Sequence, residues 1–254
     1  MDLHGFSSIV TGGSSGLGAA VVRTLEAQGC AVVVLDRDPL VSGSGSGSGS
    51  TLGLACDVSD EASVADAVAE TTRRHGPARI IVNCAGVGDN GRVLGRNGVL
   101  PLAAFRRVLD INVAGTFNVI RLAMAELAKA PELPGFGRGV IVNTSSIAAF
   151  DGQTGQAAYA ASKAAVVGLT LPLAREFARL AVRVMTICPG VFHTPMVDAH
   201  VSAQVLDGLL AHGAYPKRAG DPAEFAELVL AIVRNPMLNG EVIRLDGGLR
   251  MPAF

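Results

Sequence analysis

The chain lacks the features that would direct it to a membrane or to nucleic acid. No apolar run reaches the roughly 18 consecutive residues that a membrane-spanning helix needs. The N-terminal segment MDLHGFSSIVTGG has no basic start followed by an apolar signal core. The 21 lysines and arginines are balanced by 22 aspartates and glutamates, and no long basic cluster attracts an anionic partner. We therefore expect a cytoplasmic protein that binds neither membranes nor nucleic acid.

Cysteine is also scarce and widely spaced. Cys30, Cys56, Cys84 and Cys188 include no C-x-x-C pair, which argues against a zinc site and against a disulfide framework. We expect buried thiols and no bound metal. Because Cys84 and Cys188 lie where predicted strands end, either one could also face a ligand, although a nucleophilic role is the less favoured alternative.

The residues that are present suit an α/β protein. Hydrophobic residues make up 49% of the 254 positions and charged residues 17%, as in sheets whose strands are buried on both faces. Strand-length apolar runs occur at 8–10, 31–35, 52–56, 79–82, 140–143, 183–187 and 241–245. Helix-length segments occur at 18–28, 61–75, 104–130, 157–180 and 223–234. This alternation predicts a single domain over residues 1–254, a doubly wound parallel seven-stranded sheet with helices on both faces, which is a Rossmann fold.

One segment breaks the alternation. Residues 42–50 read SGSGSGSGS, where a crossover helix between the second and third strands would be expected. Alternating glycine and serine has no apolar face to bury and a high ordering cost, so it predicts a flexible surface loop. The composition fits both a natural low-complexity loop and an engineered replacement.

The stretch from Ser146 to Lys163 contains residues that suit proton transfer. Tyr159 and Lys163 are four positions apart, which places both side chains on one face of a helix, about one turn apart. There the ammonium can lower the pKa of the phenol, so that Tyr159 exchanges a proton with a substrate oxygen. Ser146 would hydrogen-bond the same oxygen. The alternative is a buried tyrosine beside an unrelated surface lysine.

A glycine-rich turn predicts a dinucleotide site. Residues 11–18 read TGGSSGLG, directly after the first predicted strand and at the start of a helix. Glycine lets the backbone approach a pyrophosphate closely, and the N-terminus of a helix offers unpaired amides to the phosphates.

Two carboxylates follow the next two strands. Asp36 ends the second strand, where it can accept both ribose hydroxyls and would repel a 2′-phosphate, so it favours NAD over NADP. Arg37 argues the other way, because a cation there could accommodate the phosphate, and Asp36 could instead start a turn before Asp38. Asp57 follows the third strand and could either bond the adenine amino group or cap the next helix.

Together these motifs resemble the short-chain dehydrogenase/reductase family. The resemblance rests on residues 11–18, 83–86 and 189–190 and on Asn112, Ser146, Tyr159 and Lys163, in the order and at the spacings of that family. It covers nearly the whole chain, and the spacings are those of the short oxidoreductase branch rather than of the longer sugar-nucleotide epimerases. Longer stretches at 112–123, 155–175, 183–196 and 220–251 resemble the dehydrogenases of 3-hydroxyacyl-CoA and hydroxysteroids.

The resemblance implies a catalytic set of four residues, namely Asn112, Ser146, Tyr159 and Lys163. In that set Lys163 also holds the nicotinamide ribose, and Asn112 holds a water that relays the proton to solvent. A structural role in kinking a helix is the alternative for Asn112. Family members commonly form tetramers through long helices that correspond to 104–130 and 157–180, so we expect a homotetramer.

The resemblance and the motifs also imply a set of contacts to NAD or NADH. These residues are Gly12, Ser15, Gly16, Leu17, Gly18, Asp36, Asp57, Val58, Asn83, Cys84, Ala85, Gly86, Tyr159, Lys163, Pro189, Phe192 and Thr194. Thr194 would bond the carboxamide. Cys84 would contact the cofactor through its backbone, a role that needs no thiol chemistry.

The segment 195–217 predicts a lid over the substrate. Its apolar residues recur at mostly helical spacings, although ordinary core packing explains the same pattern. With Ser146 and Tyr159, the predicted substrate contacts are Met196, Leu206 and Leu209. We expect residues 89–101 to line the other side of the cleft. A small apolar ketone or an acyl-CoA fits these walls better than a sugar.

We therefore expect an NAD-dependent oxidoreductase that interconverts a secondary alcohol and a ketone, on a 3-hydroxyacyl-CoA or a hydroxysteroid. A 3-oxoacyl carrier-protein reductase or a broad-specificity ketone reductase is the alternative among enzymes, and a preference for NADPH would favour it. A non-catalytic dinucleotide-sensing scaffold is an alternative of another class. The presence of all four catalytic residues weakens that alternative.

Overall fold

The computed structural model describes residues 1–39, 51–88, 91–96, 98–200 and 203–253. Its main sheet has seven parallel strands in the order β3-β2-β1-β4-β7-β8-β9. They are β1 (Ser7–Thr11), β2 (Ala31–Asp36), β3 (Leu52–Ala55), β4 (Ile80–Asn83), β7 (Gly139–Thr144), β8 (Val182–Pro189) and β9 (Val242–Leu245). The predicted fold is confirmed, and every predicted strand is present. Residues 42–50, for which we predict a flexible loop, lie outside the described residues.

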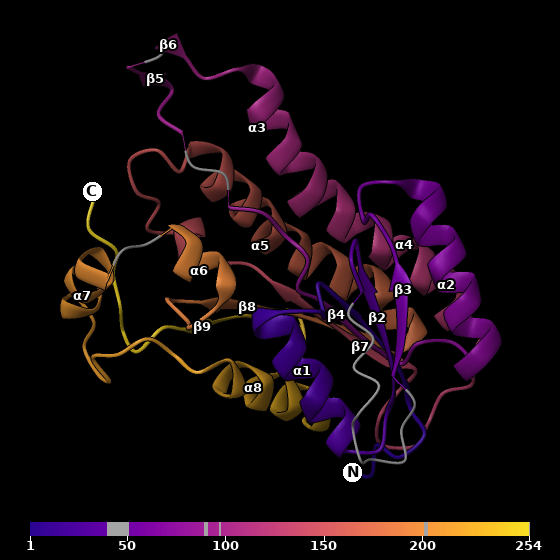
Figure 1. Cartoon of the computed structure of the whole chain (residues 1–254). Coiled ribbons are helices and arrows are strands. Elements are labelled where there is room, and N and C mark those ends of the chain that lie inside the picture. Colours follow the sequence, from indigo (N-terminus) through magenta and orange to yellow (C-terminus); the bar gives the residue numbers. More distant parts are fainter. Residues whose placement is uncertain (40–50, 89–90, 97, 201–202, 254) are drawn as a thin grey trace.

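Helices cover both faces of this sheet (Figure 1). On one face lie α1 (Gly16–Ala27) and α8 (Pro222–Arg234), and on the other lie α2 (Glu61–His75), α4 (Thr116–Leu127) and α5 (Ala157–Phe177). Successive residues of a strand point to opposite faces, so Val10 packs in the first layer and Ile9 in the second. Because both layers exclude water, the strands are apolar at nearly every position.

The strand order reverses at β1, which has β2 on one side and β4 on the other. At such a reversal the chain leaves neighbouring strands in opposite directions, so a crevice forms beyond their carboxyl ends. The glycine turn follows β1, Asp36 ends β2, and residues 83–86 include the end of β4. The topology therefore brings these three motifs to one crevice.

The predicted helix over 104–130 is present as one helical stretch over Leu102–Leu127, but it is not a regular α-helix throughout. The structure has α3 (Leu102–Leu109), then a π-helical turn over Asp110–Gly115, then α4. Gly115 in this turn lies against the loop after β3, where a Cβ added to it would be only 2.7 Å from Cγ2 of Val58. The widened turn also holds Asn112, and π-helical turns within α-helices are frequent at functional sites.

Smaller elements surround the open end of the crevice. β5 (Leu94–Gly95) and β6 (Gly98–Val99) form an antiparallel pair that projects away from the main sheet (Figure 1). Strands of two residues leave no periodic pattern, so the sequence did not predict them. The predicted lid contains α6 (Pro195–His200) and α7 (Ala203–Ala211), while residues 201 and 202 between them lie outside the description.

Two helical stretches are long and apolar enough to cross a membrane when judged by length and composition alone. They are Leu102–Leu127 and Ala157–Leu180, with 50% and 39% of their apolar windows buried. Both pack against neighbouring elements of the domain, as the core helices of a soluble Rossmann domain do (Figure 1).

Candidate active site

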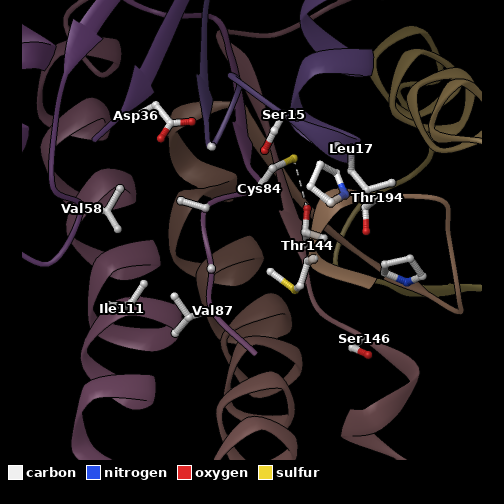
Figure 2. Close-up of a pocket in the computed structure, with 18 of the residues that line it drawn as sticks. Ser15, Leu17, Asp36, Val58, Cys84, Val87, Ile111, Thr144, Ser146 and Thr194 are labelled. Carbon is white, nitrogen blue, oxygen red and sulfur yellow. Dashed lines mark hydrogen bonds between the residues drawn. The ribbon is translucent and has the colours of Figure 1, made fainter. Parts of the chain in front are cut away.

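A cavity of about 360 Å³ lies beyond the carboxyl ends of the central strands, and its walls come from segments far apart in the sequence (Figure 2). Most of the predicted site residues line it. They are Gly12, Ser15, Gly16, Leu17, Gly18, Asp36, Asp57, Val58, Cys84, Ala85, Gly86, Ser146, Tyr159, Lys163, Pro189, Phe192, Thr194 and Met196. The tertiary structure thus collects these residues at one place, and their individual roles stay predictions.

Four predicted residues lie away from these walls. Asn83 is buried at the end of β4, where its Nδ2 donates to Oδ1 of Asn143 at 2.9 Å. Asn112 is buried behind the wall. Leu206 and Leu209 of α7 do not line the cavity, so their predicted contact with substrate has no support from its walls.

Several cavity residues were missed by the sequence analysis. They are Leu35, Cys56, Val87, Ile111, Thr144 and Ser145, whereas Arg37, Gly190, Pro195 and Val197 lie in motifs that the sequence already indicated. Most are direct neighbours of predicted site residues along the chain, and that adjacency was the available signal. Ile111 follows no strand end, and the π-helical turn that holds its neighbour Asn112 places it at the cavity wall.

At the glycine turn, backbone segments approach one another too closely for any side chain to fit between them. Gly12 has φ +64°, and a Cβ added to it would lie 2.8 Å from the amide nitrogen of Ala85. A Cβ on Gly18 would lie only 2.2 Å from the carbonyl oxygen of Gly12. The turn ends at Ser15, the N-cap of α1, whose side chain makes no capping bond. The first amides of α1 therefore face the cavity with the positive end of the helix dipole, an arrangement that suits a phosphate.

Asp36 connects the end of β2 to this turn. Its Oδ2 accepts from the amide of Ser14 at 3.1 Å, and its carboxylate faces the cavity (Figure 2). This position, one strand away from the glycine turn, is where a ribose attached to the pyrophosphate would lie. Arg37 also lines the cavity.

Asp57 does not cap α2, so that alternative is wrong. The N-cap is Asp60, whose side chain accepts from the amide of Ser63 at 2.7 Å. Asp57 instead accepts from the amide and the hydroxyl of Ser59, at 2.9 and 2.6 Å, and these bonds lower the pKa of its carboxyl. Asp57 is thus an ionised acceptor on the cavity wall.

Tyr159 and Lys163 lie one turn apart on α5, as predicted. The Nζ of Lys163 is 5.7 Å from the centre of the Tyr159 ring and donates to the carbonyl oxygen of Thr144 at 3.0 Å. Burial lowers the pKa of Lys163 to about 8, so the ammonium form still predominates at neutral pH. Ser146 completes the group, with its Oγ accepting from the amide of Ala148 at 3.1 Å.

The predicted net lowering of the tyrosine pKa is wrong for this arrangement. Burial raises the pKa of Tyr159, and a hydrogen bond with Ser146 opposes that increase only in part. The physical reason is desolvation, which disfavours the phenolate in a closed site. A further positive charge in the cavity would be needed to make Tyr159 a base near neutral pH.

The side chain of Asn112 links the loop after β4 to α5 by hydrogen bonds. Its Oδ1 accepts from the amide of Val87 at 2.8 Å, and its Nδ2 donates to the carbonyl of Val87 at 3.0 Å and to Oγ of Ser162 at 2.9 Å. The Oγ of Ser162 in turn donates to the carbonyl of Tyr159 at 2.7 Å. These bonds favour the structural alternative for the Asn112 side chain, and the water relay stays a prediction.

The four thiols are free, and Cys30, Cys56 and Cys188 are buried as expected. Burial raises the pKa of the Cys84 thiol to about 11, and Thr144 donates to its sulfur at 3.4 Å (Figure 2). A thiol with such a pKa is a poor nucleophile at neutral pH. Among the residues that the structure describes, no group of three or more histidine, cysteine or acidic side chains could hold a metal ion.

Comparison with known proteins places the chain among dehydrogenases. The family model described as short chain dehydrogenase matches residues 8–204. The 3-hydroxyacyl-CoA dehydrogenase type-2 of Homo sapiens is 46% identical over 98% of this chain and 97% of the relative. The protein of that name from Drosophila melanogaster is also 46% identical, over 96% and 97%. The crystal structure of 3-hydroxyacyl-CoA dehydrogenase type-2 from Mycobacterium avium is 37% identical, covers 98% of each chain and gives a TM-score of 0.89.

Proposed function

Since the chain belongs to the short-chain dehydrogenase family, we propose that it interconverts 3-hydroxyacyl-CoA and 3-oxoacyl-CoA thioesters with NAD as its cofactor. The chain is an oxidoreductase that acts on secondary alcohols with a nicotinamide dinucleotide, which leaves the scaffold alternative without support. One observation carries the proposal. Ser146, Tyr159 and Lys163 line the same cavity as the glycine turn and Asp36.

The residues present fit a dinucleotide. Side chains at Gly12 and Gly18 would collide with backbone atoms of the turn. With glycine at both positions the turn stays compact, and its amides can approach a pyrophosphate closely. Asp36 would hold the adenosine ribose, and Lys163 and Thr194 would hold the nicotinamide end. When bound, NAD supplies the hydride acceptor, and the positive charge of its oxidised ring favours the ionised phenol.

Tyr159 and Ser146 act at the substrate oxygen, and Lys163 acts at the cofactor. Tyr159 gives or takes the proton on that oxygen. Ser146 accepts from Ala148, and its own hydrogen, which faces Tyr159 here, would turn to the substrate oxygen when substrate binds. Lys163 has three N–H groups, and only one is used by Thr144, so two remain for ribose hydroxyls.

The substrate would enter between α6 and the loop after β4. A Cβ added to Gly88 in that loop would be 3.4 Å from Sδ of Met196, so the Met196 side chain lies next to this loop at the entrance. Met196 lines the cavity and is partly exposed, as suits an apolar wall for an acyl chain. The role of residues 195–217 as a lid is part of this proposal.

A comparison of substrates tests the proposed function directly. Oxidation of NADH should be followed by its absorbance with acetoacetyl-CoA, an acetoacetyl carrier protein, a steroid ketone and simple ketones side by side. We expect acetoacetyl-CoA to give the highest kcat/KM. Turnover of the carrier-protein substrate or of simple ketones with none of acetoacetyl-CoA would contradict the assignment.

The choice of NAD over NADP rests on Asp36 and can be tested there. Asp36→Asn keeps the size of the side chain but removes the charge that repels a 2′-phosphate. The ratio of kcat/KM with NADH to that with NADPH should fall by at least about tenfold, since a charge-assisted hydrogen bond contributes about 1.5–3 kcal/mol. Asp38→Asn is the matched control, because Asp38 is exposed and does not line the cavity. An unchanged ratio in Asp36→Asn would show that another group selects the cofactor.

Assembly and compartment belong to the same proposal. We propose a homotetramer that pairs through α4 and α5, on which Phe117 and Leu171 are exposed apolar side chains. We also propose a reducing compartment such as the cytoplasm, since all four thiols are free.

A further inference from the structure

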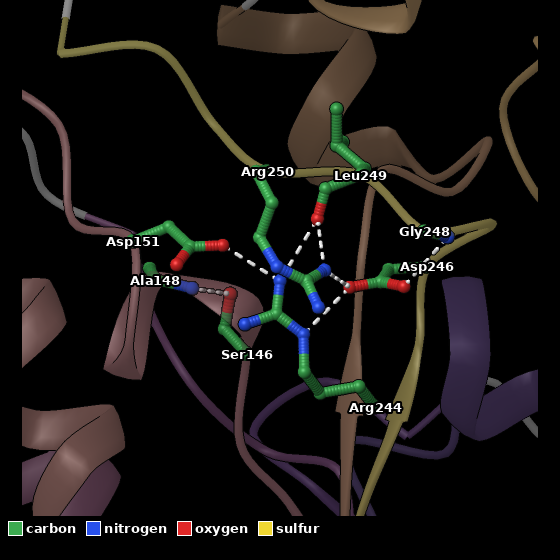
Figure 3. A network of polar contacts seen from close by, with 8 residues as sticks. All are labelled: Ser146, Ala148, Asp151, Arg244, Asp246, Gly248, Leu249 and Arg250. Atoms are coloured by element: carbon green, nitrogen blue, oxygen red, sulfur yellow. Dashed lines mark hydrogen bonds and ion pairs between the residues drawn. The ribbon is translucent and has the colours of Figure 1, made fainter. Parts of the chain in front are cut away.

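Arg244 lies on β9, at the edge of the sheet, and is the centre of a polar network outside the cavity (Figure 3). Its Nη2 donates to Oδ2 of Asp151 at 2.6 Å and to the carbonyl of Leu249 at 2.9 Å. Its Nε donates to Oδ2 of Asp246 at 2.8 Å. The guanidinium also lies over the ring of Phe150, 5.3 Å from its centre. One side chain thus holds segments that are far apart in the sequence.

Asp151 lies in the connection between Ser146 and the helix that carries Tyr159. Ser146 caps the 3₁₀ turn over Ile147–Ala149, and the amide of Asp151 donates back to the carbonyl of Ile147 at 2.9 Å. The carboxylate that Arg244 holds therefore belongs to the turn that Ser146 begins. Any shift of this turn changes the direction of the Ser146 hydroxyl.

The network reaches the opposite wall of the cavity as well. The amide of Gly190, a cavity residue, donates to the carbonyl of Leu245 at 2.9 Å, and a Cβ on Gly190 would lie 2.8 Å from Cβ of Asp246. The C-terminal segment then crosses the same connection, where Pro252 accepts from Nε2 of Gln153 at 3.1 Å. The connection is thus held from the β9 side at Asp151, at Gln153 and at Thr154, which donates to the carbonyl of Ala253 at 2.9 Å.

The charges of the network are largely shielded from water. The side chains of Arg244, Asp151 and Asp246 are 21%, 19% and 6% exposed. In such surroundings, removing one partner leaves a poorly solvated charge behind, so the pair favours a single geometry. Neither Arg244 nor Asp151 lines the cavity, so we expect both to act on the site through the residues they hold.

We propose that Arg244 and Asp151 are positioning residues that set the distance between the hydroxyls of Ser146 and Tyr159. The inference rests on the proposed function, because it concerns the two groups that meet the substrate oxygen. Orientation of reacting groups is sensitive to shifts of an ångström or less, so a small displacement of the turn lowers the rate of proton transfer. Binding of the dinucleotide, which uses the glycine turn and Asp36, is left unaffected.

A double-mutant cycle tests this assignment. Asp151→Asn, Arg244→Gln and the double variant should each lower kcat for ketone reduction by about tenfold, with the Kd for NADH at the parent value. The loss in the double variant should equal that in Arg244→Gln alone, because without the guanidinium Asp151 has no ion pair left to lose. A parent-like kcat in Asp151→Asn, or losses that multiply in the double variant, would overturn the proposal. Asp151→Asn is isosteric, so the kcat of this variant tests the positioning role even if Arg244→Gln does not fold.

Arg250→Gln is the matched control within the network. Arg250 approaches Asp246 only at 3.4 Å and is 62% exposed, so its loss should leave kcat unchanged. Hydrogen exchange gives a second measurement that needs no turnover. The amides of residues 148–151, which bond to Ser146 and Ile147, should exchange faster in Asp151→Asn but not in Arg250→Gln.

The two hypotheses fail in different ways. A parent protein that reduces no ketone would remove the proposed function, while faster exchange in Asp151→Asn would still support the holding role of the ion pair. Unchanged exchange in Asp151→Asn together with an active parent would remove the positioning role and leave the proposed function standing.

Discussion

Replacement of Tyr159 by phenylalanine is expected to lower kcat for ketone reduction by about a thousandfold, within the range for loss of a general acid. The variant keeps the ring beside Lys163 and loses only the hydroxyl. The packing of this half-buried residue is therefore preserved, and the change in rate reports the proton transfer itself. The assay is the initial rate of NADH oxidation, and NADH fluorescence should give an unchanged Kd.

Tyr215 provides the matched control for this experiment. It is the second of the two tyrosines of the sequence, and its side chain is 85% exposed. Tyr215→Phe should have the parent kcat, because Tyr215 does not line the cavity. If Tyr159→Phe turned over as fast as the parent, the proton would have to come from another group, and the proposed mechanism would fail.

Replacement of Gly18 by alanine should weaken NADH binding by about a hundredfold. The added methyl group would lie 2.2 Å from the carbonyl oxygen of Gly12 and 3.0 Å from Cα of Gly13. Both are backbone atoms, so the turn must open, and overpacking of this kind costs up to about 3 kcal/mol. The turn would then no longer present its amides to a pyrophosphate. Fluorescence titration with NADH measures the loss.

Gly168 on α5 gives the matched control for Gly18. Within one copy of the chain no described atom lies within 4 Å of a Cβ added at Gly168, so alanine there disturbs neither the fold nor the glycine turn. Gly168→Ala should bind NADH as the parent does, with a small gain in helix stability of about 1 kcal/mol. Parent-like binding by a folded Gly18→Ala protein would show that the turn does not cradle the phosphates.

The order of elements and the place of most site residues could be predicted from the sequence. Buried strands are apolar on both faces, and amphipathic helices alternate with them, so the α/β pattern is a local property of the chain. Helix α2 has the predicted bounds because Asp60 caps its start and Gly76 follows its end. The glycine turn could be predicted too, since its close backbone contacts exclude any larger residue.

Other features could not be predicted, because they depend on contacts between distant segments. Asn112 follows no strand end, and only the fold shows that its side chain is used by Val87 and Ser162. Leu206 and Leu209 have the pattern of a lid, yet α7 places them away from the cavity walls. A pattern along one helix does not say which neighbour its apolar side faces.

The sequence by itself determined the fold class and the order in which the site residues follow the strands, because apolar periodicity and the need for glycine are local. Only the tertiary structure decided the direction of the Tyr159 pKa, since desolvation depends on how completely the surrounding segments exclude water. It also decided that Arg244 and Asp151, 93 positions apart, meet beside Ser146. Such contacts arise from packing of the whole sheet, and no local pattern encodes them.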